Sequence, residues 1–447
     1  MRTITIAGNL RRLSKPISVL IPVAVFLLFT RLAMEPDLSR SIPLLLIICG
    51  IIVILLALTQ YLAVQWSFSW SVPLIIGIAI FIRLIFIREP PVLSDDLYRY
   101  LVDGQAILRG ISPYAMAPEA ADFLPPDMAN LPELVNHSHL ITLYPPAAQI
   151  VFAAGATMGI LIDPLIGMKL VLCIMDICTC MMMITLVRSL DIPACRVILY
   201  AWNPLPVMEI AGSGHIDGAA VFFFTAALML TSRAKTGIFT GVFMALAILT
   251  KWIPLMILPA WLLLVPNKKR ATALASALLT SGILTALFWP ELTNGIATLG
   301  QYLRHWEFSG FVFRSLRQLS GSGIIARSIV AALFTGIVGV LFIRHVFFHT
   351  SRKNIFAYLA VVSTAFPMLS PTVYPWYALY PAACLSFVQT PAVLILSWSV
   401  LLSYRILMVR HTTGLWIEDD LTPLLIIAAP AAAIAIQGIV ARFSMRQ

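Results

Sequence analysis

Charged residues are scarce in this chain of 447 residues: they make up 11% of it, against about 25% in a typical soluble domain. The chain also lacks the glycine-rich GxxxxGK(S/T) phosphate loop, so a nucleotide-hydrolysing site is not indicated. Its six cysteines show no metal-ligand spacing, and most lie in apolar segments, where we expect them to act as small apolar fillers. These absences argue against a soluble enzyme, a cysteine-bound metal site and a nucleotide-hydrolysing enzyme.

Hydrophobic residues, in contrast, make up 60% of the chain and fall in runs of up to about 17–25 residues, the length of a membrane-spanning helix. Because lipid cannot satisfy backbone polar groups, such runs predict helices rather than a barrel. We expect an all-α polytopic membrane protein with about 13–14 transmembrane helices. The predicted spans are residues 17–33, 42–62, 71–88, 143–161, 165–188, 217–233, 236–250, 252–265, 271–289, 324–344, 355–370, 376–389, 391–409 and 421–440.

One further apolar piece, residues 194–210, is short and interrupted by Asn203-Pro204-Leu205-Pro206. Prolines break helices, and unwound backbone at membrane depth is tolerated only inside protein or beside a wet cavity. We therefore predict a re-entrant segment. With that choice most basic clusters of this chain, whose formal net charge is +10, fall on the inner side of the membrane. The positive charge thus reports topology rather than nucleic-acid binding.

This topology divides the chain into three parts. Residues 1–70 form an extra N-terminal hairpin, residues 71–410 a transmembrane core, and residues 411–447 a last helix with a basic tail. Three segments of the core are set apart from its spans. They are a large first external loop (89–142), the re-entrant segment with Gly214-His215-Ile216-Asp217 (194–218), and a second external loop (290–323).

The first external loop begins with two acids, Asp95 and Asp96, soon after an apolar span. The spacing of the polar residues that follow predicts a helix, with Asp96, Arg99, Tyr100 and Asp103 on one face. A neighbouring carboxylate or partial burial raises the pKa of an acid and suits it to act as a general base. The alternative is a solvated helix start, where acids favour the first turn. We interpret this face as the centre of an active site.

A second group of polar residues follows the broken segment. His215 and Asp217 come after glycines, which let the backbone approach a ligand closely, so we expect them to line a substrate pocket. The alternative is a capped helix start. Two such ligands do not define a metal site. Lys251 lies between two apolar runs, where it either meets an anion such as a lipid phosphate or extends to the membrane interface.

Basic and aromatic residues interleave in the second external loop and near residues 374–377. Arginines suit phosphate, and aromatic rings with hydrogen-bonding groups suit the face of a sugar, although aromatic belts are also common at membrane interfaces. The candidate substrate contacts of this kind, together with one tyrosine of the first loop, are Tyr114, Arg304, His305, Arg314, Tyr374, Trp376 and Tyr377.

Charged residues inside the predicted spans are few, and each needs a partner there. Lys169 and Asp176 lie in the predicted span 165–188 at positions that share a helical face. We expect these two side chains to pair as a structural contact.

Several short motifs occur in an order that resembles the GT-C superfamily of membrane glycosyltransferases, and in particular bacterial polyprenol-phosphate-mannose-dependent mannosyltransferases of mycobacterial type. They extend from about residue 70 to 410 and are Asp96-Leu97-Tyr98-Arg99-Tyr100, Ser112-Pro113-Tyr114, Tyr144-Pro145-Pro146, Trp202-Asn203-Pro204-Leu205, Gly214-His215-Ile216-Asp217, Lys251-Trp252-Ile253-Pro254 and Tyr374-Pro375-Trp376-Tyr377. The resemblance implies a GT-C-like catalytic core in residues 71–410. It also implies an acidic catalytic base in the first external loop, for which Asp96 matches best and Asp95 second.

The resemblance implies an inverting transfer of a sugar, mannose or another hexose, from a polyprenyl-phosphate donor to a lipid- or glycan-linked acceptor. The active site would lie at the external face of a bacterial inner membrane, without an organic cofactor and with a divalent cation left open. Cations placed near the leaving phosphate would stabilise its growing charge. The candidates are Lys251, Arg304, His305 and Arg314.

A multi-pass transporter of a glycolipid or a small anion is the competing interpretation, because broken helices also mark transport sites. Transporters are typically built from two halves with matched broken segments. This sequence shows one broken segment and one long acidic loop, which favours the enzyme.

Overall fold

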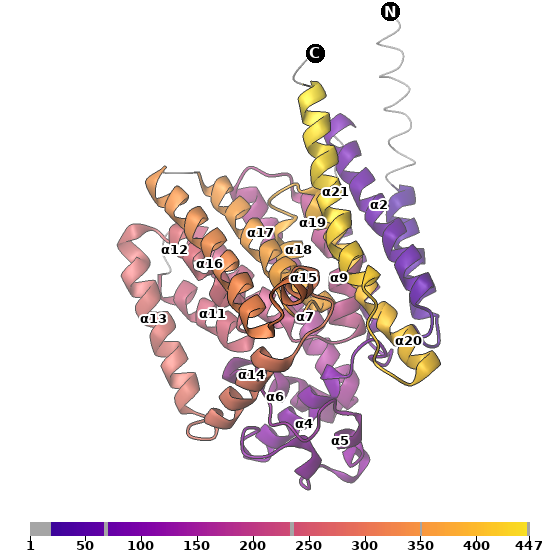
Figure 1. Cartoon of the computed structure of the whole chain (residues 1–447), viewed down its shortest axis with the longest axis vertical. Coiled ribbons are helices and arrows are strands. Elements are labelled where there is room, and N and C mark those ends of the chain that lie inside the picture. Colours follow the sequence, from indigo (N-terminus) through magenta and orange to yellow (C-terminus); the bar gives the residue numbers. More distant parts are fainter. Residues whose placement is uncertain (1–18, 67–69, 233–236, 349–350, 445–447) are drawn as a thin grey trace, which may run out of the picture.

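The computed structural model describes residues 19–66, 70–232, 237–348 and 351–444. These residues form helices and loops, and their only β-type pairings are isolated bridges from Phe308 and Ser309 to Thr372. Figure 1 shows the helices packed side by side, with the segment between residues 89 and 145 gathered at one end. The expected all-α polytopic class is confirmed. Residues 1–18 and 445–447, which belong to the predicted hairpin and basic tail, lie outside the described residues.

Five helical segments of the described chain are long and apolar enough to cross a membrane by length and composition. Each coincides with a predicted span. They are α2 (Ile42–Trp66), α7 (Pro164–Ser189), α16 (Gly323–Phe347), the run Pro391–Thr413 formed by α19 (Pro391–Ser399), η7 (Val400–Tyr404) and α20 (Arg405–Thr413), and α21 (Leu421–Ser444).

The other apolar runs form helices that are shorter or less apolar. They are Val19–Ala33, α3 (Val72–Phe86), α6 (Pro146–Leu161), α11 (Gly237–Thr250), η5 (Ile253–Ile257) with α12 (Leu258–Leu264), α13 (Asn267–Ala286), α17 (Arg352–Leu369), and η6 (Pro375–Ala378) with α18 (Leu379–Cys384). The described residues thus hold fewer full-length spans than hydropathy alone predicts. One reason is that prolines such as Pro254 and Pro375 restart the helix within apolar runs.

The predicted break near residue 203 is present. The chain passes from η3 (Ala194–Val197) and α8 (Ile198–Ala201) to α9 (Pro204–Pro206) and the π-helix η4 (Val207–Gly212), and α10 (Asp217–Ser232) leaves at an angle of 119°. Asn203 caps the restart, because its side-chain oxygen accepts a hydrogen bond from the Leu205 backbone N–H at 3.0 Å. Every residue from 197 to 220 is buried, so this irregular backbone lies inside protein.

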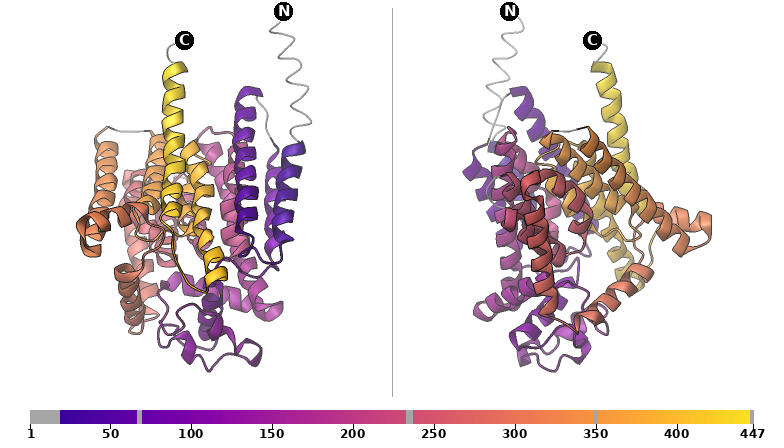
Figure 2. Two further views of the ribbon diagram at one scale, coloured as in Figure 1. Left: turned by 45° about the vertical axis from the view of Figure 1, so that its right-hand side comes forward. Right: turned by 90° about the vertical axis from the view of Figure 1, so that its left-hand side faces the viewer.

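The segments predicted to form the two external loops meet at one end of the bundle. Their helices are α4 (Asp96–Leu108), η1 (Pro118–Ala120), η2 (Pro126–Met128), α5 (Leu131–Leu134), α14 (Leu292–His305) and α15 (Phe311–Ser320). Asn294 donates a hydrogen bond to the Tyr114 carbonyl at 3.0 Å, and the rings of Trp306 and His137 pack edge to face at 4.9 Å. In both views of Figure 2 the segment that contains α4 and α5 lies below the bundle.

The N-terminal hairpin and the C-terminal helices pack together beside the core. Both α2 and α21 contact α19. The turn after Val19–Ala33 is joined to the end of α20 by a hydrogen bond between Ser39 Oγ and His411 Nε2 at 2.7 Å.

One expectation about the interior is wrong: Lys169 and Asp176 do not pair. Arg83 of α3 donates to Asp176 Oδ2 at 2.6 Å, and the Tyr200 hydroxyl donates to Asp176 Oδ1 at 2.7 Å. Lys169 donates instead to two backbone carbonyls near the C-terminal end of α3. Both residues face α3, and that neighbouring helix offers each a better partner than the other could. All six cysteines are free and five are buried, as expected for fillers.

Candidate active site

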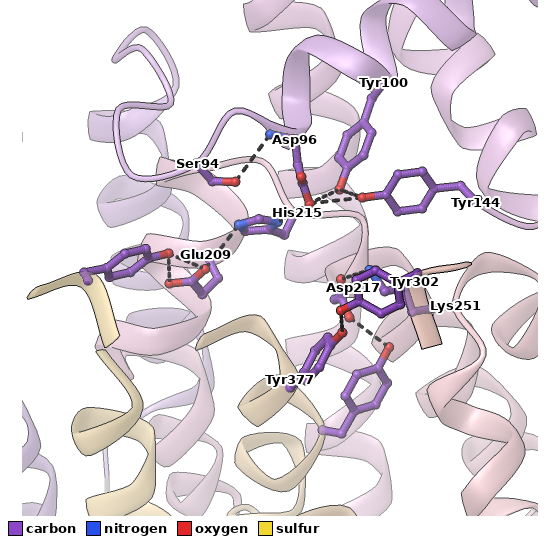
Figure 3. Close-up of polar contacts among 12 residues, drawn as sticks. Ser94, Asp96, Tyr100, Tyr144, Glu209, His215, Asp217, Lys251, Tyr302 and Tyr377 are labelled. Carbon is purple, nitrogen blue, oxygen red and sulfur yellow. Dashed lines mark hydrogen bonds and ion pairs between the residues drawn. The ribbon is translucent and has the colours of Figure 1, made fainter. Parts of the chain in front are cut away.

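The carboxylate of Asp96, the first residue of α4, lies at the centre of a polar cluster. The Tyr144 hydroxyl donates a hydrogen bond to Asp96 Oδ2 at 3.0 Å, and the Tyr100 hydroxyl lies 3.5 Å from the same oxygen (Figure 3). The Asp96 side chain is 28% exposed. One carboxylate oxygen is therefore held in place while the side chain remains accessible, which is the arrangement that a general base requires.

Asp95 precedes α4 and neighbours Asp96, but its side chain does not cap the helix. Burial, and after it the charge of Asp96, raises the pKa of Asp95 to about 6. The raised pKa suits Asp95 to accept a proton. The tyrosine hydrogen bonds distinguish Asp96 from its neighbour.

His215 carries the cluster into the interior. Its fully buried ring stacks on Trp376 with centroids 3.8 Å apart. Nδ1 lies 3.7 Å from Asp96 Oδ2, and Nε2 lies 3.4 Å from Glu209 Oε2. The Tyr404 hydroxyl lies 2.9 Å from each Glu209 carboxyl oxygen. The result is a row of four groups, two of them carboxyls, that leads from the accessible acid into the protein. Figure 3 shows its first three members, Asp96, His215 and Glu209.

A glycine allows the chain to place His215 there. Gly214 has a φ of +74°, in the left-handed region, and a Cβ at this position would lie 2.7 Å from Leu97 Cδ1. Glycine adopts this conformation without the strain that other residues meet. The backbone bend is therefore packed directly against α4, which begins at Asp96.

Lys251, directly after α11, supplies a positive charge beside the acids. Its Nζ lies 3.1 Å from Oδ2 of the fully buried Asp217 and 5.0 Å from the centre of the Tyr144 ring. The Tyr380 hydroxyl donates to Asp217 Oδ1 at 3.3 Å. Tyr144 contacts Lys251 with its ring and Asp96 with its hydroxyl, so one side chain links the cation to the accessible carboxylate.

Aromatic side chains form one wall of the cluster. Tyr374 stacks on Trp376, with centroids 4.4 Å apart and planes 7° apart, and Trp376 stacks in turn on His215. The Tyr377 hydroxyl lies 2.7 Å from the hydroxyl of Tyr302 on α14. This contact brings the second loop to the same place as the predicted residues Tyr374, Trp376 and Tyr377.

Three predicted site residues of the first loop make their contacts within that loop or to α6 rather than in the cluster. The Arg99 guanidinium donates to three backbone carbonyls of the first loop. Asp103 is buried and accepts a hydrogen bond from Gln149 at 3.1 Å, and burial raises the pKa of Asp103 to about 6. The Tyr114 hydroxyl donates to the Tyr144 carbonyl at 2.6 Å. These contacts build the first loop and attach it to α6.

The four candidate cations for a leaving phosphate have different surroundings. Arg314 forms an ion pair with Glu418, in the loop before α21. Arg304 and His305 are exposed, and neither makes an ion pair in the part of the chain that is described. Lys251 is the member of this set that lies with Asp96.

Several members of the cluster were not predicted as site residues: Tyr144, Glu209, Tyr302, Tyr380 and Tyr404. Glu209 did carry a signal, since an acid in a broken apolar segment needs a partner. Tyr144 and Tyr302 lie in stretches that the sequence singled out, and Tyr380 and Tyr404 carried no such signal. Tyr404 and Glu209 are 195 positions apart, and Tyr380 and Asp217 are 163 apart, so their pairing depends on helix packing.

The described residues contain no group of three or more histidine, cysteine, aspartate or glutamate side chains placed to hold a metal ion. His215 and Asp217, the two residues considered for that role, face different partners. The imidazole faces Asp96 and Glu209, and the carboxylate faces Lys251 and Tyr380.

Residues 22–267 match the family described as alpha-(1->6)-mannopyranosyltransferase, N-terminal domain. The match covers more than half of the chain, includes most of the N-terminal hairpin, and contains the cluster residues Asp96, Glu209, His215, Asp217 and Lys251. Among curated proteins, no sequence matches the chain.

Proposed function

The chain belongs to this mannosyltransferase family, and on that premise we propose that it transfers mannose, with inversion, from a polyprenyl-phosphate donor to a lipid- or glycan-linked acceptor. Asp96 is the general base, and Lys251 is the cation that faces the leaving phosphate. The family match favours this reaction over transport, because residues 22–267 match a mannosyltransferase domain.

The proposed reaction is a direct displacement. Asp96 takes the proton of the acceptor hydroxyl while the acceptor oxygen forms a bond to the anomeric carbon of mannose. The bond between that carbon and the phosphate oxygen breaks, and polyprenyl phosphate leaves with the electron pair. Lys251 stabilises the charge that grows on the phosphate, which is effective because the ammonium is already in place before the reaction.

The observation that carries this proposal is the link between base and cation through Tyr144. The hydroxyl of Tyr144 lies 3.0 Å from Asp96, and its ring centre lies 5.0 Å from Lys251. The partly accessible carboxylate and the ammonium are thus neighbours at one end of the bundle. An attacking hydroxyl and a leaving phosphate must lie on opposite sides of the anomeric carbon. A base at the hydroxyl of Tyr144 and a cation at the ring of the same tyrosine suit this geometry.

The location of the cluster supports a lipid-linked donor. It lies where the loop-rich end meets the helix bundle, so the phosphate of a donor can reach it while the polyprenyl chain stays in the bilayer. We propose that this end faces the exterior of a bacterial inner membrane, as the distribution of basic residues predicts. The aromatic wall of Tyr374 and Trp376 would contact the sugar, and no organic cofactor is required.

The test is mannose transfer by protein reconstituted in vesicles, with polyprenyl-phosphate [14C]mannose as donor. Asp96→Asn should lower kcat by about 10²- to 10⁴-fold, the usual contribution of a general base, with little change in donor binding. Asp95→Asn is the matched control, because it removes a neighbouring carboxylate of the same loop, and it should retain most of the activity. Full activity of Asp96→Asn would show that this residue is not the base. Transfer of mannose from GDP-mannose, and not from the lipid-linked sugar, would refute the proposal of a polyprenyl-phosphate donor.

A further inference from the structure

Glu209 is a carboxyl group for which the transfer reaction above has no use. It lies in the π-helix η4, is fully buried, and contacts Tyr404 on one side and His215 on the other. Single π-turns inside helices occur often at functional sites. A carboxyl buried this deeply is costly to maintain, so its position calls for a physical role.

The charges around Glu209 favour its neutral form. Lys251 lies 3.1 Å from Asp217, so that pair compensates itself. Among the described residues, no lysine or arginine lies within ion-pair distance of Glu209, whose one such contact is the imidazole of His215. An unpaired carboxylate in apolar surroundings takes up a proton rather than stay charged.

The imidazole of His215 can transmit this protonation state to Asp96. Neither ring nitrogen has a hydrogen-bond partner among the described residues, and each faces one of the two carboxyl groups: Nδ1 lies 3.7 Å from Asp96 Oδ2, and Nε2 lies 3.4 Å from Glu209 Oε2. A neutral imidazole carries one N–H. If Glu209 donates its O–H to Nε2, the ring proton is on Nδ1 and points at the Asp96 carboxylate. If Glu209 were ionised, Nε2 would carry the proton and the Nδ1 lone pair would repel that carboxylate.

We propose that Glu209 is a protonated positioning residue that fixes His215 as the Nδ1–H tautomer and thereby holds Asp96 ionised and oriented for proton transfer. The proposal rests on the role of Asp96 as the base. In this row of groups Glu209 would act as the buried third group does in other enzymes, where such a group orients the imidazole beside the reacting residue. Trp376 keeps the ring in the required plane by stacking at 3.8 Å.

The kinetic test compares two substitutions of one residue. Glu209→Gln places an amide N–H where the acid O–H donates and leaves an oxygen for Tyr404, so kcat should stay within about threefold of the unmodified protein. Glu209→Met keeps the volume but removes the donor, so kcat should fall at least about tenfold with the donor KM unchanged. Thermal melts of both variants in the same detergent separate this effect from a loss of folded protein.

Either of two kinetic results would overturn the proposal. Loss of activity in Glu209→Gln equal to that in Glu209→Met would mean that a carboxylate, not a neutral donor, is needed. Unchanged kcat in Glu209→Met would mean that Glu209 does not act on Asp96. If Asp96→Asn abolishes transfer while Glu209→Met does not, the inference fails and the proposed function stands.

A spectroscopic test does not depend on the role of Asp96. In protein labelled with 15N-histidine, the His215 signals, identified by their loss in His215→Gln, should show a protonated Nδ1 and an unprotonated Nε2 at neutral pH. Glu209→Gln should keep this tautomer and Glu209→Met should not. An imidazolium, or a proton on Nε2 in the unmodified protein, would contradict the proposal. If the tautomer is as expected but Asp96→Asn remains active, the proposed function alone is refuted.

Discussion

Substitution of Lys251 can separate the stability of this site from its chemistry. Lys251→Met removes the ammonium that lies 3.1 Å from the fully buried Asp217. Breaking a buried ion pair by removing one partner typically costs about 3–5 kcal/mol, because the remaining charge is uncompensated. The Lys251 side chain is 14% exposed and Tyr380 still donates to Asp217. We therefore expect the free energy of unfolding to fall by about 3 kcal/mol, the lower end of that range.

Adding Asp217→Asn to Lys251→Met should repair the folding defect but not the activity. Replacement of both members of a buried ion pair by neutral side chains of similar size is often close to neutral, so the double variant should unfold within about 1 kcal/mol of the unmodified protein. Loss of a preorganised electrostatic group should still cost about 2.7–4 kcal/mol of transition-state stabilisation, or about 10²- to 10³-fold in kcat.

The measurements are thermal unfolding in detergent, followed by tryptophan fluorescence, and single-turnover mannose transfer in vesicles. The transfer rate is divided by the fraction of protein that is folded. The single variant Asp217→Asn serves as the control, because it retains the ammonium of Lys251. A double variant that is stable and has the kcat of the unmodified protein would refute the role of Lys251 at the leaving phosphate. Its function would then be limited to neutralising Asp217.

Three further predictions concern the supports of the site. Burial raises the pKa of Asp103 in the folded protein to about 6, above its ordinary value of 3.8, so the folded state loses stability relative to the unfolded state as the pH rises between these values. Between pH 4 and 7, thermal melts of Asp103→Asn should therefore show a free energy of unfolding that rises by up to about 3 kcal/mol relative to the unmodified protein. Gly214→Ala should cost about 1–2 kcal/mol in left-handed strain and, by displacing the adjacent histidine, should lower kcat measured per folded molecule; an unchanged kcat would show that the bend tolerates a side chain. Arg83→Met should destabilise the fold by about 3–5 kcal/mol, because it leaves the buried Asp176 without its cation, and adding Asp176→Asn should recover most of that loss.

The sequence alone determined the features that depend on local patterns. Apolar run length predicted a helical membrane protein, and the prolines after Asn203 predicted the broken segment that the structure bends by 119°. Polar spacing predicted the helix that begins at Asp96, and the order of short motifs predicted the mannosyltransferase family. The spans, the break and the helix are each encoded in one short stretch of the chain, where backbone sterics and side-chain periodicity act without help from distant residues. The family is encoded in the order of several such stretches between about residues 70 and 410.

Only the tertiary structure decided which side chains meet. Periodicity placed Lys169 and Asp176 on one face but could not show that Arg83 would reach the acid first. It likewise could not show that Glu418 would pair with Arg314, or that backbone carbonyls would surround Arg99. A buried charge takes the best partner that packing brings within reach, and that partner is set by how distant helices cross rather than by the sequence around either residue.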